Sequence, residues 1–188
     1  SIDKAQQLSA SGSASLNIGP GNVVAVITNL SLEMATADVV TGNTAITGLG
    51  TTAGTIDGAN VLVFTISGAN LFVGTGGALN GGRTAVVTTG AVGFSVSGAS
   101  FAMASVTKGT TSFTGVEATI TNAALLGVNA VDLQVTGTVK LNSTSVANGP
   151  RVDWDSATTE PSTATNLLPA LSIDKAQQLS ASGSASLN

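Results

Sequence analysis

The first seventeen residues of this 188-residue chain, Ser1 to Asn17, return without a change as Ser172 to Asn188. Identity at all seventeen positions does not arise by chance, so the natural unit ends at Leu171, and the chain holds one unit and the start of the next. Each unit of such an array must be able to pack against a copy of itself. We therefore expect tandem units, in which residues 1–171 form one complete repeat and residues 172–188 begin its neighbour.

A weaker pattern recurs inside the unit. Apolar residues alternate with other residues, and a Ser or Thr followed by Gly or Asn comes next, in the segments 8–12, 26–29, 64–71, 94–101, 118–125 and 133–137. Residues two apart lie on one face of a β-strand, and a Gly or Asn at a constant place indicates a bulge or bend. The sequence predicts an all-β unit: an elongated β-solenoid or roll-like repeat unit in a tandem array, with a two-sheet β-sandwich per repeat as the alternative.

The unit divides by composition into a β-rich body, residues 1–154, and an inter-repeat link rich in Pro, Ser and Thr, residues 155–171. The link ends on leucines, which favour packing against a neighbouring unit over exposure to water. We also expect the strand signal at 8–18 to pair with the preceding unit's sheet, so a chain of residues 1–171 should be less stable than one that carries 172–188. The junction is predicted to use apolar residues of both regions: Leu8, Ala10, Leu16, Ile18, Leu167, Leu168, Leu171, Leu179 and Leu187.

Composition excludes several classes of function. The sequence contains no His, Cys or Tyr, so the imidazole bases and thiolate nucleophiles of many enzymes are missing. The net charge is −4 and the six basic residues are scattered, whereas a nucleic-acid partner requires a basic surface. The apolar stretches fall short of the roughly 20 residues that span a bilayer. We expect no enzyme activity, no cofactor, no nucleic-acid partner and no membrane insertion.

Asp153 and Asp155 flank Trp154, the single Trp of the chain. On a strand, two such carboxylates share one face at a separation of roughly 7 Å, an arrangement that fits half of a calcium site or a glycosidase-like pair. The alternative, which we prefer, is an aromatic side chain that closes the core between two solvated acids, because no third carboxylate is near in the sequence. Asp153 and Asp155 thus remain a weak calcium candidate.

Several segments resemble the β-strand repeats of very large bacterial surface proteins. They are Gly93-Phe-Ser-Val-Ser-Gly98, Ala104-Ser-Val-Thr-Lys-Gly-Thr110, Phe113-Thr-Gly-Val116, Val135-Thr-Gly-Thr-Val-Lys-Leu-Asn142 and Arg151-Val-Asp-Trp154. The resemblance covers roughly residues 60–155. It implies an extracellular, giant, adhesin-like protein of many repeats that serve as stalk or fibre, and it brings no catalytic residues. The dense Asp runs of calcium-binding adhesins are missing.

These features predict a structural repeat of an extracellular bacterial filament, stalk or giant adhesin at the cell surface, with inter-repeat β-sheet contacts that make a rigid fibre. Its partners are neighbouring copies of the same repeat, in one chain or in a fibre. One alternative is a carbohydrate- or ice-binding β-solenoid that uses the Ser, Thr and Asn surface. Another is a polysaccharide-acting β-helix enzyme that would use Asp153 and Asp155.

Overall fold

The computed structural model describes residues 6–19, 21–128, 131–160 and 166–187. These residues are all-β, as predicted, and none of them lies in a helix that could cross a membrane. The strands are β1 (Gln6–Ile18), β2 (Val23–Val40), β3 (Thr55–Thr75), β4 (Ala78–Leu79), β5 (Val86–Val87), β6 (Val92–Lys108), β7 (Thr111–Leu126), β8 (Leu133–Thr144), β9 (Thr158–Glu160) and β10 (Leu179–Leu187).

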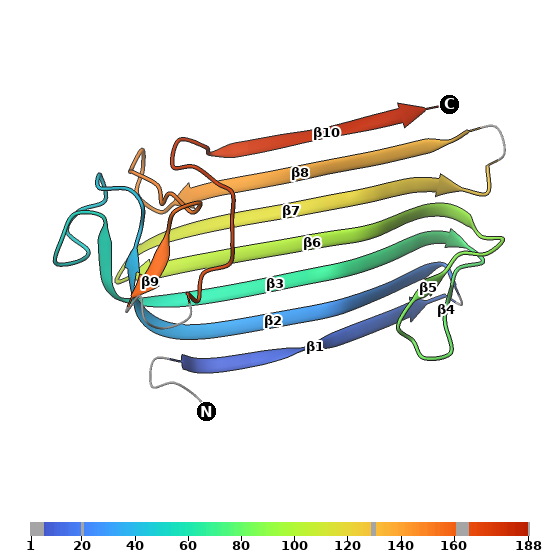
Figure 1. The fold of residues 1–188 in the computed structure, drawn as a ribbon, viewed down its shortest axis with the longest axis horizontal. Helices are drawn as coiled ribbons and strands as arrows, with labels where there is room; N and C mark the ends of the chain where they lie inside the picture. Colours follow the sequence, from blue (N-terminus) through green and yellow to red (C-terminus); the bar gives the residue numbers. More distant parts are fainter. Residues whose placement is uncertain (1–5, 20, 129–130, 161–165, 188) are drawn as a thin grey trace.

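One antiparallel sheet contains eight of these strands. Seven follow the order β1-β2-β3-β6-β7-β8-β10 (Figure 1), and β9 pairs with one end of β2. The remaining two, β4 and β5, form a small hairpin in the connection from β3 to β6. Apart from β9, the strands of this sheet therefore lie side by side in the order in which they occur along the chain. The two ends of the described chain, β1 and β10, form the two edges of the sheet.

The main strands are unusually long, because β3 has 21 residues and β2 has 18, against a usual range of about 3–10. Side chains alternate between two faces of the sheet. We call one the cap face, because loops cover it; Val61 and Val63 of β3 lie there and are buried. The other is the open face, which carries Leu62 and Phe64 of the same strand.

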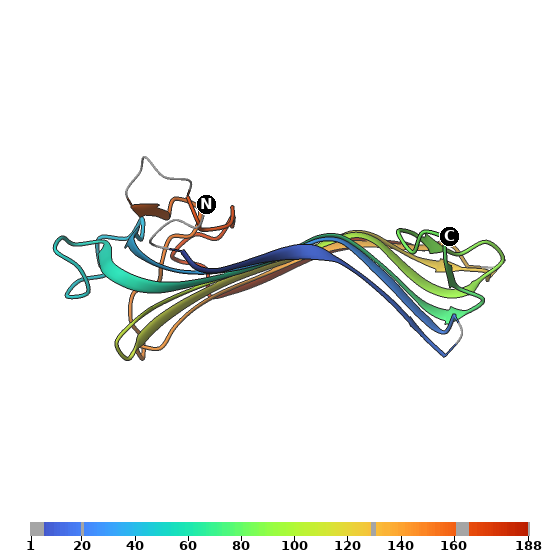
Figure 2. The same ribbon diagram turned by 90° about the horizontal axis from the view of Figure 1, so that it is seen from below.

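Loops cover the cap face at both ends of the strands and leave the middle of the sheet one layer thick (Figure 2). At one end, loops 41–54, 145–157 and 166–178 close the main core over β2, β3, β6 and β7. Its buried residues include Val39, Ile46, Ile56, Val106, Phe113, Val152, Trp154, Leu168, Leu171 and Ile173. At the other end, the connection that holds β4 and β5 covers Val24 and Phe72, both fully buried.

A row of bulges crosses the middle of the sheet. β2, β3, β6 and β7 each carry an extra residue relative to their partners, at Thr28-Asn29, Ser67-Gly68, Ser97-Gly98 and Thr121-Asn122. These are the Ser/Thr and Gly/Asn positions of the sequence pattern, so the predicted bulges are confirmed in four strands, whereas β1 at Gly12 and β8 at Gly137 carry no extra residue. Threonine side chains brace them, because the hydroxyls of Thr28 and Thr121 donate to the carbonyl oxygens of Gly68 (3.2 Å) and Gly98 (2.9 Å). The sheet bends along this row (Figure 2).

Candidate functional site at the two edges of the sheet

The repeated sequence lies at both edges of the sheet (Figure 1). In the first copy it forms β1, which pairs with β2 as far as Ile18↔Val23. In the second copy it forms β10, which pairs with β8 from Leu179↔Leu141 to Leu187↔Leu133. Residues 8–16 and 179–187 are identical. One strand sequence therefore pairs with two different strands, β2 in one copy and β8 in the other.

The hydrogen bonds show which side of β10 is used. The backbone N–H of Asn142 donates to the carbonyl of Gln178 at 2.9 Å, and every second residue of an antiparallel strand bonds to the same neighbour. The peptide groups of alternate serines therefore face β8; they belong to Ser180, Ser182, Ser184 and Ser186. The peptide groups of the residues between them, such as Ala181 and Gly183, face the open edge.

In β1 the same residues face the opposite way. The carbonyl of Ile18 accepts from Asn22 at 3.2 Å, in the hairpin that leads into β2. From Ile18 back to Leu8, the peptide groups of the even-numbered residues therefore face β2. The register shift between Gly12 and Ala14 does not change this direction, because its extra residue lies in β2. The peptide groups of Ser9, Ser11, Ser13 and Ser15 therefore face the free edge. They are the counterparts of the serines by which β10 binds β8, so the free edge of β1 presents the groups that β8 can pair.

Close packing distinguishes the two copies of one glycine. A Cβ added to Gly183 would lie 2.5 Å from the carbonyl oxygen of Thr136 on β8, whereas a Cβ added to Gly12 would have no atom within 4 Å. Gly12 and Gly183 are the same position of the repeat. In the described part of the chain, no neighbour of β1 requires the glycine, whereas close packing on β8 does.

The residues before β10 are anchored in the unit that precedes them. Ile173 is fully buried in the main core. The carboxylate of Glu117 accepts bonds from the backbone N–H (2.8 Å) and hydroxyl (3.0 Å) of Ser172, and Lys140 Nζ donates to the Ser172 carbonyl at 2.7 Å. A segment that belongs by sequence to the next repeat thus completes the core of this one.

Asn142 connects strand, loops and repeated segment through one buried side chain. Its amide nitrogen donates to the carbonyls of Val152 (2.8 Å) and Asp174 (3.2 Å), and its side-chain oxygen accepts from Trp154 Nε1 at 3.0 Å. Asn142 is fully buried. The sequence pattern missed it, together with Glu117 and Lys140, because a polar residue in an alternating strand looks solvent-facing. The one sequence signal for a junction role of Ile173 is that residues 172–173 are identical to the start of the chain.

The residues predicted for the junction fall into two groups. Leu8, Ala10, Leu16 and Ile18 lie on β1, and Leu179 and Leu187 lie on β10, all on the open face. Leu168 and Leu171 are buried in the main core beside Ile173, with Leu167 packed against them. The described parts of the link, 155–160 and 166–171, thus pack on their own unit, while 161–165 lie outside the described residues. The link leucines therefore lie beside Ile173 of the repeated segment in the main core.

The prediction for Asp153 and Asp155 on one strand face is wrong, because residues 151–156 form a loop and a turn. The backbone N–H of Asp153 donates to Thr41 at 2.9 Å and that of Asp155 to Ile173 at 3.3 Å, so the two residues are held by different segments. The Asp153 carboxylate lies 3.6 Å from Lys175 Nζ, and Trp154 packs into the main core. Within the described ranges, no group of three or more acidic side chains is placed to hold a metal ion.

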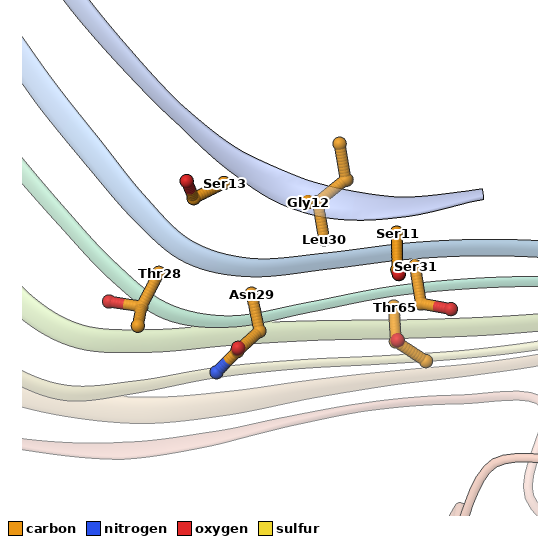
Figure 3. A pocket seen from close by; sticks show the side chains of 8 residues that line it. All are labelled: Ser11, Gly12, Ser13, Thr28, Asn29, Leu30, Ser31 and Thr65. Carbon is orange, nitrogen blue, oxygen red and sulfur yellow. The ribbon is translucent and has the colours of Figure 1, made fainter.

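A shallow groove of about 390 Å³ lies on the cap face beside the row of bulges (Figure 3). Its lining comes from β1, β2 and β3: Ser11, Gly12, Ser13, Thr28, Asn29, Leu30, Ser31 and Thr65. Hydroxyls of Ser11, Ser31 and Thr65 come from three successive strands. These groups offer hydrogen bonds to a ligand but no acid–base chemistry.

Comparisons with known proteins identify no relative of this chain. No family model, no curated protein and no solved structure matches the chain. The two edges of the sheet carry one sequence and pair through its opposite sides, which distinguishes this chain.

Proposed function

We propose that this chain is a structural repeat of an extracellular bacterial filament, stalk or giant adhesin, in which successive units share a strand. In this arrangement β10 is β1 of the next unit, paired with β8 on one side and with the next unit's β2 on the other. The supporting observation is that one sequence makes these two pairings through opposite sets of peptide groups. A sheet built this way continues across every unit boundary and leaves no exposed edge.

The two registers combine without conflict. Leu179 lies opposite Leu141 of β8, and its counterpart Leu8 lies opposite Met34 of β2. The combined sheet would thus place Leu141 of one unit, the shared leucine, and Met34 of the next unit in a line. Each unit contributes six strands to it: β1, β2, β3, β6, β7 and β8. The elongated solenoid-like or roll-like body expected from the sequence would then be a property of many units.

The anchoring of residues 172–178 supports a rigid junction. Burial of Ile173 and the bonds of Ser172 fix the chain on the preceding unit before the shared strand begins. Burial of one Ile side chain contributes about 1.5–3 kcal/mol, so the junction consists of more than one strand ladder. The extracellular bacterial setting rests on the resemblance of the repeat motifs to giant surface proteins.

A chain that ends at Leu171 tests the proposal. It leaves the β8 edge and the main core without residues 172–188, while its own β1 keeps a free edge. We expect such chains to assemble edge to edge into filaments, visible by electron microscopy and light scattering. A synthetic peptide of residues 172–188 should bind one per chain and stop the growth. A 1–171 chain that stays monomeric and does not bind the peptide would overturn the proposal.

Proline substitutions provide the matched control. The N–H of Ser11 faces the free edge, so Ser11→Pro should leave the β1–β2 ladder intact and abolish filament growth, since proline is tolerated on edge strands. The N–H of Ala10 faces β2, so Ala10→Pro should destabilise the folded unit itself. Filaments that survive Ser11→Pro would show that growth does not use this edge.

A further inference from the structure

The open face of the sheet is apolar over the central part of its strands, and none of the described loops covers it (Figure 2). Eleven of the fifteen exposed large hydrophobic residues described lie on it. They are Leu8, Leu16, Ile18, Met34, Val73, Phe94, Ile120, Val139, Leu141, Leu179 and Leu187. Both caps lie on the other face (Figure 2). No charged side chain interrupts the open-face positions of residues 8–18, 23–34, 62–73, 94–103, 116–125, 133–141 and 179–187.

The strands are also built to be covered on both sides. Residues Val61, Leu62, Val63 and Phe64 are apolar without alternation, a pattern typical of strands that are buried on both faces. Val61 and Val63 are buried under the cap. Leu62 and Phe64 point the other way, where the ring of Phe64 lies 5.9 Å from that of Phe101 on β6. Within one chain, only the cap-face side chains of this segment are therefore buried.

We infer that the open face binds the open face of a second copy of this chain, so that two sheets pack back to back. Seven strands spaced about 4.8 Å apart, over nine residues of about 3.3 Å each, cover about 1,000 Å². A typical stable interface buries about 800 Å² per partner, and the largest apolar patch on a monomer is usually about 300–600 Å². The area of the open face therefore suits a dimer and is large for a surface left in water.

The surroundings of the face favour a protein partner over a lipid surface. At one end of the strands it meets a polar rim, where Gln7 donates to Thr36 at 2.8 Å and the Thr36 hydroxyl donates to Asn60 Oδ1 at 3.5 Å. A polar rim around an apolar centre is the usual anatomy of a protein interface. Surfaces that bind lipid carry interfacial Trp and Tyr and a basic border, whereas Trp154 lies in the main core and the chain has no Tyr.

This pairing uses the face of one unit and does not depend on the shared strand. Two such sheets would lie about 10 Å apart with their side chains interdigitated. Together they form a sandwich of two eight-stranded sheets. If units also share strands, the open face becomes a continuous apolar ribbon, and two ribbons can cover each other over their full length.

Molar mass in solution tests the inference with the full 188-residue chain, in which β10 covers the β8 edge. We expect the wild type to have twice the 18.2 kDa mass of one chain, by sedimentation equilibrium. Val139→Lys and Met34→Lys each place a charge on the open face at exposed positions, and both should reduce the mass to that of one chain. Gln134→Lys adds the same charge to β8 on the cap face, also at an exposed position, and should leave the dimer intact.

The Ser11→Pro variant separates face from edge. A dimer that survives Ser11→Pro and dissociates with Val139→Lys supports the inference. A dimer that dissociates with Ser11→Pro and survives Val139→Lys would overturn it and support edge pairing alone. A monomeric wild type that sediments with phosphatidylcholine–phosphatidylglycerol vesicles would assign the face to lipid and overturn it as well. A wild type that is monomeric and does not bind vesicles would also contradict it.

Discussion

Gly12 and Gly183 place one residue of the repeat in two surroundings. A Cβ on Gly183 would lie 2.5 Å from the Thr136 carbonyl oxygen, which is fixed in the β8 ladder, whereas a Cβ on Gly12 meets nothing. We expect Gly183→Ala to destabilise the 188-residue chain by about 1–3 kcal/mol. Gly12→Ala should stay within about 0.5 kcal/mol of the wild type. Urea denaturation of the two variants measures the difference.

The same substitution reports on assembly at the residue scale. In the 1–171 chain, Gly12 would meet Thr136 of the preceding unit once the strand is shared, so Gly12→Ala should weaken filament growth although it leaves the single unit unchanged. Equal free energies of unfolding for Gly12→Ala and Gly183→Ala in the full chain would show that β10 does not lie on β8 in solution.

At the scale of the strand, the bulges depend on backbone conformation. Gly98 has φ +67°, and an added Cβ would lie 3.2 Å from the Thr121 side chain. The left-handed conformation costs an ordinary residue about 1–2 kcal/mol, and Asn tolerates it better. Gly98→Ala should therefore lower the melting temperature more than Gly98→Asn does, although both add a Cβ. Equal losses would assign the cost to crowding by Thr121 instead.

The bulges also show how far the sequence could predict the elements. Alternation followed by Gly or Asn was enough to place the bends at Ser67-Gly68 and Ser97-Gly98, because the signal is local to each strand. Alternation also separates the two faces of a strand. It contains no information on what covers each face, so neither the cap over Val61 nor the bare side at Phe64 was predictable.

The junction between units was also predictable only in part. Identity of the two segments predicted that residues 8–18 take part in contacts between units, because a strand signal repeated at that distance needs a second partner. The anchoring by Asn142 was not predictable, since a buried polar side chain is recognisable only when its three partners, two carbonyls and an indole, are placed around it. The prediction that Asp153 and Asp155 share a strand face was wrong for a related reason. The alternation of residues 151–155 resembles a strand, but the N–H groups of the two acids bond to two different segments.

At the scale of the whole molecule, strand sharing fixes the dimensions of an array. Each unit adds six strands side by side, and strands are spaced about 4.8 Å apart, so the axial repeat should be about 29 Å. The strands would run across the filament, because the sheet grows in the direction of its hydrogen bonds. Aligned filaments of the 1–171 chain should therefore show a strong fibre-diffraction reflection at about 4.8 Å along the axis.

Independent domains joined by a link would give a different result. The long axis of each unit lies along its strands (Figure 1), and β3 with 21 residues of about 3.3 Å each is about 70 Å long. Units joined end to end along that axis would have an axial repeat at least as long as β3, with strands parallel to the filament. A measured repeat of about 29 Å requires side-by-side strands, and a repeat of about 70 Å would rule out a shared strand at the junction.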